Sequence, residues 1–110
     1  MQALEDGVLV RVFLGEDDKF GDRPLYEAIV AKAREMRVAG ATVMRGPMGF
    51  GHSSLVHTTK IMPLSRDLPL VIEIIDRQDK IDEFLPLLDK LMPGGLVTLE
   101  KVKLVGYGSR

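Results

Sequence analysis

The sequence predicts an α+β protein with the ferredoxin-like order of elements, strand–helix–strand–strand–helix–strand, in a chain of 110 residues. Four short runs rich in Val, Ile and Leu are typical of strands, and two longer stretches repeat apolar residues at helical spacing. Each helical stretch lies between two strand-like runs, which is the order of the split βαβ unit. The length suits one domain over 1–110, with both helices on one face of a four-stranded antiparallel or mixed sheet.

The first half of the chain is expected to form a strand and a helix. Residues 7–15, GVLVRVFLG, alternate across two faces as a half-buried strand does, and the acidic turn at 16–18 is expected to be solvated. Asp22 is a good N-cap, Pro24 suits a first helical turn and Gly40 is a natural stop, so a helix is expected between them. Its apolar stripe comprises Leu25, Ile29, Ala33 and Met36.

The second half repeats this pattern after a second strand. Residues 41–45 and 68–76 are expected to be strands, and the latter is nearly apolar throughout, which indicates a central position in the sheet. Asp76 is expected to cap a second helix, which Pro86 should bend because proline donates no backbone hydrogen bond. The pair Gly94–Gly95 is expected to end that helix. Its apolar stripe comprises Ile81, Phe84, Leu85, Leu88 and Leu91.

Two features of the expected sheet indicate an oligomer, with a partly solvated sheet as the alternative. The face turned away from the helices carries apolar residues on the first and third strands, and Arg11 and Glu73 could form an ion pair among them. The last strand, from 96 to about 108, changes the phase of its apolar residues, which indicates a β-bulge or a change of partner strand. The apolar residues of the open face are Leu9, Phe13, Val71 and Ile75.

Composition and charge exclude several classes of protein. The formal net charge of −1 is unlike the basic excess of proteins that bind nucleic acids. The chain has no cysteine, which excludes disulfide scaffolds, thiolate zinc sites and cysteine nucleophiles. The N-terminal residues lack the regions of a secretory signal, and no apolar run approaches the ~20 residues of a membrane span. A cytoplasmic location is therefore expected.

The segment RGPMGFGHSS, residues 45–54, is the candidate functional feature. Its three glycines could shape a phosphate-binding loop, but they lack the spacing of a Walker loop and precede no helix, so a simple turn is the alternative. The whole connection, residues 46–67, is much longer than the ~2–5 residues that hairpin loops commonly need, and long loops are often functional. Alternating residues at 55–60 indicate that it extends as a hairpin.

The two histidines of the chain lie in the same segment and give a second hypothesis. With Asp67, His52 and His57 could bind a metal, as in a trimeric metal-binding or metal-tolerance protein of the same fold. Ser53 and Ser54 beside His52 do not predict catalysis, because adjacent residues rarely present a nucleophile to its base and no orienting acid is evident. The chain is therefore not expected to be an enzyme, and a purely structural trimer is the third hypothesis.

The chain resembles the PII-like signalling proteins over nearly its whole length, and most of all an uncharacterised PII-like family. The motifs that carry the resemblance are PLYEAIV (24–30), GATVMRGPMGFG (40–51), VHT (56–58), LPLVIEIID (68–76) and GLVTLE (95–100). The resemblance implies a trimer whose sheets face the central axis, an adenine nucleotide bound in clefts between subunits, and a loop at 46–67 that acts as the effector arm. Genes of this family often lie beside a fluoride exporter or are fused to one, which implies a membrane transporter as partner.

The resemblance also assigns roles to two glycine turns. Gly49 and Gly51 match the glycines at the base of the effector loop, where the backbone approaches the nucleotide. The pair Gly94–Gly95 matches a second turn whose backbone amides face the phosphates. The candidate ligand-binding residues are Arg45, Gly46, Gly49, Phe50, Gly51, His52, Ser53, Ser54, Gly94 and Gly95.

The sequence departs from PII proteins in the charged residues that would hold phosphates. His52, Ser53 and Ser54 stand where PII proteins carry Arg, Gln and Lys, and no lysine follows Gly95. The ligand is therefore left open among AMP, ADP, ATP and a cyclic nucleotide. The available cations are Arg45, Lys60, Arg66 and Arg110.

Overall fold

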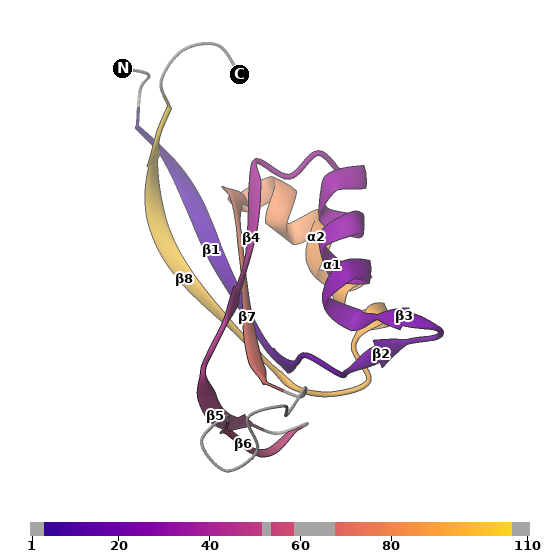
Figure 1. The fold of residues 1–110 in the computed structure, drawn as a ribbon. Coiled ribbons are helices and arrows are strands. Elements are labelled where there is room, and N and C mark those ends of the chain that lie inside the picture. The colour runs from indigo at the N-terminus through magenta and orange to yellow at the C-terminus, as the bar shows by residue number, and fades with distance from the viewer. Residues whose placement is uncertain (1–3, 52–53, 59–67, 107–110) are drawn as a thin grey trace.

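The computed structural model describes residues 4–51, 54–58 and 68–106, and within them it confirms the ferredoxin-like fold. An antiparallel four-stranded sheet has the order β4-β7-β1-β8, and helices α1 and α2 both lie on one face of it (Figure 1). The sheet and helices are β1 (Leu4–Gly15), α1 (Leu25–Glu35), β4 (Gly40–Arg45), β7 (Pro69–Arg77), α2 (Gln78–Leu91) and β8 (Leu96–Val105). Two small hairpins are β2 (Lys19–Phe20) with β3 (Arg23–Pro24), and β5 (Met48–Gly51) with β6 (Ser54–Thr58).

The core lies between the two helices and the face of the sheet that they cover. Alternate residues of β1 and β7 point to this face, and the apolar stripe of each helix meets them, as the sequence predicts. Each side chain of this size contributes about 1.5–3 kcal/mol when it is fully buried. The side chains with 0% exposure are Val10, Val12, Ile29, Ile72, Ile74, Ile81 and Phe84. Of the described helices, neither is long and apolar enough to span a membrane.

The start of α1 differs from the prediction. The N-cap residue is Pro24, and it makes no side-chain capping bond, so the prediction of Asp22 as the cap is wrong. The reason is that the chain before the helix forms the β2–β3 hairpin, which occupies the position expected for a polar turn. The backbone N–H of Leu25 then donates to the carbonyl oxygen of Asp18 at 2.7 Å, which replaces the missing side-chain cap.

The end of α1 also differs, because an arginine takes the role expected of a glycine. Arg37 has φ of 60° and donates its N–H to Arg34, while the N–H of Val38 donates to the carbonyl oxygen of Ala33, both at 3.0 Å. These two bonds are those of a Schellman motif, which ends the helix before Gly40 is reached. Gly40 is instead the first residue of β4.

The junction of β7 and α2 is built around a buried carboxylate. Asp76 is 4% exposed and accepts hydrogen bonds from the backbone N–H groups of Ala39, at 2.9 Å, and Arg77, at 2.7 Å. The N-cap of α2 is Arg77 without a side-chain bond, so Asp76 ties β7 to the α1–β4 turn and does not cap the helix as predicted. The helix continues through Pro86 and ends at Leu91, before the two glycines that were expected to end it.

The phase change along β8 is not a bulge. β8 pairs with β1 in an unbroken register from Phe13↔Leu96 to Leu4↔Val105, which contradicts the predicted irregularity. The reason lies in Gly7, because the side chain of Leu104 fills the place that a Cβ atom would take there. An ideal Cβ on Gly7 would lie 2.5 Å from the Leu104 Cγ atom. β8 thus places apolar residues toward the helices at its start and on the open face at its end.

The open face of the sheet combines apolar residues with a central ion-pair network. The Arg11 guanidinium donates to Glu73 at 2.9 Å, as predicted, and also to Glu100 at 2.8 Å. The hydrogen bonds to Glu100 and then Glu73 are the main reasons why the pKa of Arg11 is raised above its ordinary value. Around this network the predicted apolar residues are half-buried, and Met44 and Leu96 on the same face are 42% and 54% exposed.

Candidate functional site

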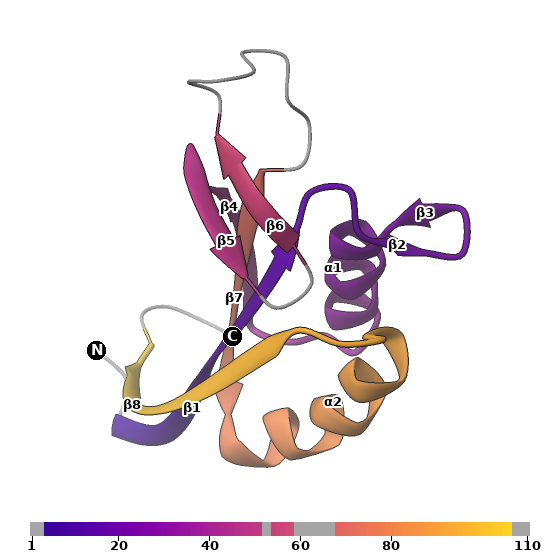
Figure 2. The same cartoon turned by 90° about the horizontal axis from the view of Figure 1, so that it is seen from below.

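The glycine segment forms the base of a second hairpin at the end of the sheet. β4 ends at Arg45, and the N–H of Gly46 extends the pairing to β7 by donating to the carbonyl oxygen of Pro69 at 2.8 Å. β5 and β6 then form the hairpin that the alternating sequence predicts (Figure 2). The register of this hairpin shifts between Gly49 and Gly51. The candidate residues Arg45, Gly46, Gly49, Phe50 and Gly51 are thus brought together at one edge of the sheet.

Two of these glycines have a structural reason within the chain. An ideal Cβ on Gly46 would lie 3.1 Å from the Pro69 Cγ atom, and one on Gly49 would lie 3.2 Å from the same atom. Both distances are shorter than ordinary carbon contacts, so a side chain at either position would push the proline ring away. A close approach of the backbone to Pro69 therefore accounts for both glycines, and their contact with a nucleotide stays a prediction.

An ion pair crosses the end of the sheet beside these glycines. The Arg45 guanidinium contacts the Glu16 carboxylate at 2.5 Å, and the two side chains are 55% and 23% exposed. The backbone N–H of Glu16 also donates to the carbonyl oxygen of Leu68 at 2.8 Å. Glu16 lies in the acidic turn that was expected to be solvated, and its sequence context gives no signal of a contact with a residue so distant in the chain.

The β5–β6 hairpin presents large apolar side chains to solvent. Phe50 is 78% exposed and Met48 is 65% exposed. Single exposed apolar residues are common on protein surfaces, whereas several close together are typical of surfaces that meet a ligand or a partner. The Phe50 ring could stack on a nucleotide base or contact a protein surface.

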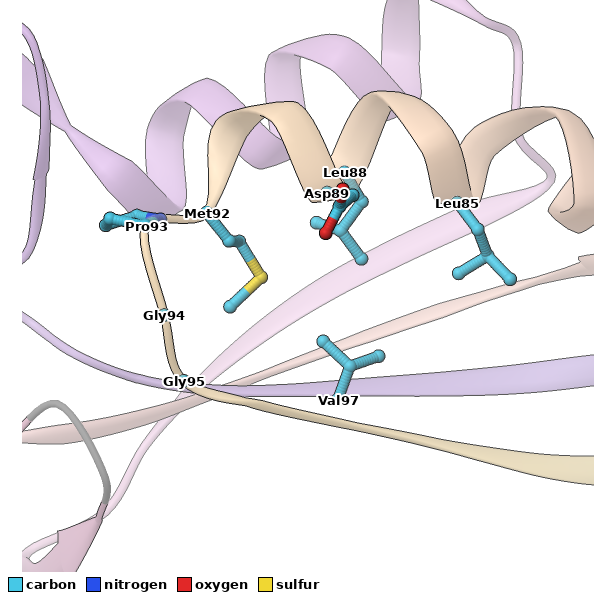
Figure 3. A pocket seen from close by; sticks show the side chains of 8 residues that line it. All are labelled: Leu85, Leu88, Asp89, Met92, Pro93, Gly94, Gly95 and Val97. Carbon is cyan, nitrogen blue, oxygen red and sulfur yellow. The ribbon is translucent and has the colours of Figure 1, made fainter.

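The second glycine turn borders a pocket of about 450 Å³ between the end of α2 and the start of β8 (Figure 3). Gly95 has φ of 108°, and an ideal Cβ there would lie 3.0 Å from Met92 Cε and 3.3 Å from the carbonyl oxygen of Phe13. Asp89 is the charged group among the lining residues, so the walls suit a ring or another apolar group better than a phosphate. The pocket is lined by Leu85, Leu88, Asp89, Met92, Pro93, Gly94, Gly95 and Val97.

The two glycine turns lie at the same end of the sheet but at opposite edges. Gly46 follows edge strand β4, Gly95 precedes edge strand β8, and β7 and β1 lie between them. Three strand spacings separate the edges by about 14 Å. A single phosphate group therefore cannot contact both turns of one chain.

A second pocket, of about 410 Å³, lies near the other end of the sheet. It is lined by Asp6, Gly7, Gln78, Lys101, Val102 and Lys103. A hydrogen bond from Lys103, reinforced by the charge of its ammonium group, lowers the pKa of Asp6 below its ordinary value. This pairing neutralises Lys103, so the pocket is less basic than its two lysines suggest.

Several predicted residues lie outside the part of the chain that the structure describes. These are His52, Ser53, Asp67 and the cations Lys60, Arg66 and Arg110. Ser54 and His57 are described as strand backbone only, with His57 opposite Gly49. Among the described residues no group of three or more His, Asp or Glu side chains could hold a metal ion. The hypothesis of a metal at His52 and His57 thus stays a prediction.

Comparison with solved structures identifies the fold as PII-like. CPII, a nitrogen regulatory PII-like protein from Thiomonas intermedia K12 bound to ADP and bicarbonate, matches with a TM-score of 0.67 over 93% of this chain and 91% of its own, at 14% identity. A GlnK–ATP complex from B. subtilis matches with a TM-score of 0.56 over 88% of this chain and 83% of its own, also at 14% identity. At these identities the likeness concerns the fold.

Sequence comparison gives the family. A UPF0166 protein from Aquifex aeolicus is 38% identical over 97 residues, which cover 88% of this chain and 91% of the relative. The profile of the DUF190 family, described as "Uncharacterized ACR", matches residues 7–104. That match spans four of the six strands and helices of the main fold in full, namely α1, β4, β7 and α2, and most of β1 and β8. The chain therefore belongs to the DUF190 family, whose fold here is PII-like.

Proposed function

We propose that the chain is a PII-like regulatory protein and not an enzyme. It forms a homotrimer, binds an adenine nucleotide in clefts between subunits, and signals through residues 46–67 to a partner. The observation that carries the proposal is the placement of the two glycine turns at one end of a PII-like sheet. CPII, which has this fold, is described as bound to ADP, and none of the proteins compared above bears an enzyme's name.

The separation of the two turns favours a ligand with two parts or a site with two chains. About 14 Å between the edges is too far for one phosphate but suits a nucleotide, whose base and phosphates can bind to different turns. A neighbouring copy could also bring its own edge next to the turn of the first chain. A nucleotide in a subunit cleft meets both conditions. The apolar pocket beside Gly95 and the exposed ring of Phe50 are each suited to the base.

The trimer is supported by the half-buried apolar residues of the open sheet face. Met44 lies on that face and is 42% exposed, whereas Val43 points to the opposite face and is 37% exposed. Met44→Glu is expected to lower the mass measured by light scattering from three times the 12.2 kDa of one chain, because it places a charge in the contact. Val43→Glu is the matched control and should keep the trimer. A monomeric wild type would refute this part of the proposal.

Nucleotide binding is tested by thermal shift and calorimetry with AMP, ADP, ATP and cyclic AMP. A ligand at a hundred times its Kd stabilises by about 2.7 kcal/mol, which raises the Tm of a small domain by roughly 10 °C. Gly94→Asp should abolish the shift, because it adds a charged side chain to the wall of the apolar pocket assigned to the base. Gly21→Asp adds the same charge to the exposed β2–β3 turn, and although its φ of 62° should lower the Tm of the free protein, the shift caused by the nucleotide should be kept. If none of the four nucleotides shifts the Tm of the wild type, adenine-nucleotide binding is wrong.

The partner is expected to be a membrane transporter such as a fluoride exporter, contacted by the 46–67 segment. Exposed Phe50 on the hairpin supports a role of this segment in contacts. Binding to a fluoride exporter in nanodiscs should depend on the nucleotide and weaken in Phe50→Ser. Phe20→Ser, which changes a ring 45% exposed on β2, is the control and should bind like the wild type. Equal binding by all three proteins would contradict the assigned contact.

A further inference from the structure

Glu16 contacts the two residues that flank the 46–67 segment, Arg45 and Leu68. Its carboxylate Oε2 accepts a hydrogen bond from Nη2 of Arg45, the last residue of β4. Its backbone N–H donates to Leu68, the residue before β7. β1 and β4 are not neighbours, because β7 lies between them, so the ion pair bridges the start of β7. One residue at the end of β1 thus joins the two ends of the candidate effector segment.

Arg45 is placed to meet an anion that arrives from solvent. Its side chain is 55% exposed, whereas the Glu16 side chain is 23% exposed. A guanidinium has five N–H donors in a planar fork, and the contact with Glu16 is made through Nη2. A phosphoryl group, with two or more oxygens and up to two negative charges, can bind the fork more strongly than one carboxylate. The two anions repel each other, so they compete for the same cation.

We propose that Glu16 is an internal competitor of the ligand for Arg45 in the nucleotide site, an inference that rests on the proposed function. The Glu16 carboxylate binds the Arg45 guanidinium in the free protein. A phosphoryl oxyanion displaces this carboxylate when the ligand binds. The ligand therefore competes with an internal anion and loses part of its affinity to that competition. Binding also breaks the ion pair that joins the end of β4 to the turn after β1. Arg45, where the effector segment leaves β4, then has two states: it contacts Glu16 in the free protein and the ligand in the complex.

The test is calorimetric titration of the full chain with ADP and, separately, with inorganic pyrophosphate at fixed ionic strength. Glu16→Gln should tighten the binding of both probes by about two- to five-fold, the range expected for loss of an exposed ion pair. Arg45→Gln should weaken both, and the gain from Glu16→Gln should disappear in the double variant. Glu83→Gln removes the same charge from the outer face of α2 and serves as the control, with affinities equal to those of the wild type.

The outcomes separate this inference from the proposed function. If ADP binds the wild type and Glu16→Gln binds no tighter, or if the gain persists without Arg45, the inference is wrong and the nucleotide function stands. If pyrophosphate shows the expected pattern and ADP does not bind, the anion competition stands and the nucleotide function is wrong. If neither probe binds the wild type or Glu16→Gln, both are overturned.

Discussion

Replacing Asp76 by alanine is expected to lower the free energy of unfolding by about 3 kcal/mol. The carboxylate is 4% exposed and accepts two backbone hydrogen bonds, from Ala39 at 2.9 Å and from Arg77 at 2.7 Å. A hydrogen bond to a charged group contributes about 1.5–3 kcal/mol, and its loss leaves a donor unpaired. Burying the carboxylate itself costs desolvation energy, and the alanine variant no longer has this cost. The net loss is therefore smaller than the sum of two such hydrogen bonds.

The measurement is urea denaturation followed by circular dichroism, with the slope of the transition as a check that the unfolded state is unchanged. Asp76→Asn keeps one acceptor oxygen and should lose about half as much as the alanine variant. Asp82→Ala is the matched control, because that carboxylate lies on the exposed face of α2 and should change stability by no more than ~0.5 kcal/mol. If Asp76→Ala costs no more than Asp82→Ala, the two backbone bonds do not stabilise the junction and the reasoning is refuted.

Three further predictions concern the sheet and its ends. The hydrogen bond and charge of Lys103 lower the pKa of Asp6 in the folded protein. This stabilises the folded protein at pH values above the pKa of Asp6 in the unfolded chain, and the stabilisation is lost as the pH falls through the pKa of Asp6 in the folded protein. The stability difference between the wild type and Lys103→Met should therefore shrink between about pH 5 and about pH 2, as followed by thermal denaturation. Gly7→Ala should cost about 1–3 kcal/mol because of the Leu104 side chain, and less in a Leu104→Ala background, when the double-mutant cycle is measured in urea. Gly95→Ala should lower the free energy of unfolding by about 1–3 kcal/mol, because alanine is strained at the Gly95 φ of 108°. An unchanged urea midpoint would contradict this.

The fold could be predicted because its signals are local. The apolar alternation of β1 and β7 and the stripes of both helices depend on residues two to four positions apart. The errors have two causes. Arg37 ends α1 through a local Schellman motif that residue preferences assign to glycine, not to arginine. Leu104 turns to the open face because Gly7, on another strand, has no side chain, and this contact joins residues far apart in the chain.

The candidate site was predictable in part for the same reason. The glycine spacing indicated the base of a long loop and a second turn, and the structure places both at one end of the sheet. The sequence did not indicate that Gly46 and Gly49 make room for Pro69, because that contact joins residues about twenty positions apart. It also did not indicate that Glu16 pairs with Arg45, since an acidic turn beside a strand is ordinary in solvated loops.

Arg37 also marks a place where the protein can be made more robust without altering its candidate site. A non-glycine residue such as Arg37 in the left-handed region destabilises the folded chain by about 1–2 kcal/mol. Glycine removes this strain, but its greater conformational freedom in the unfolded chain cancels part of the gain. Arg37→Gly is therefore expected to stabilise by about 0.5–1 kcal/mol. The residue ends α1 at the edge of the sheet where β4 begins, whereas the glycine turns lie at the end where β4 stops. Stability and ligand affinity should thus be adjustable independently in this chain.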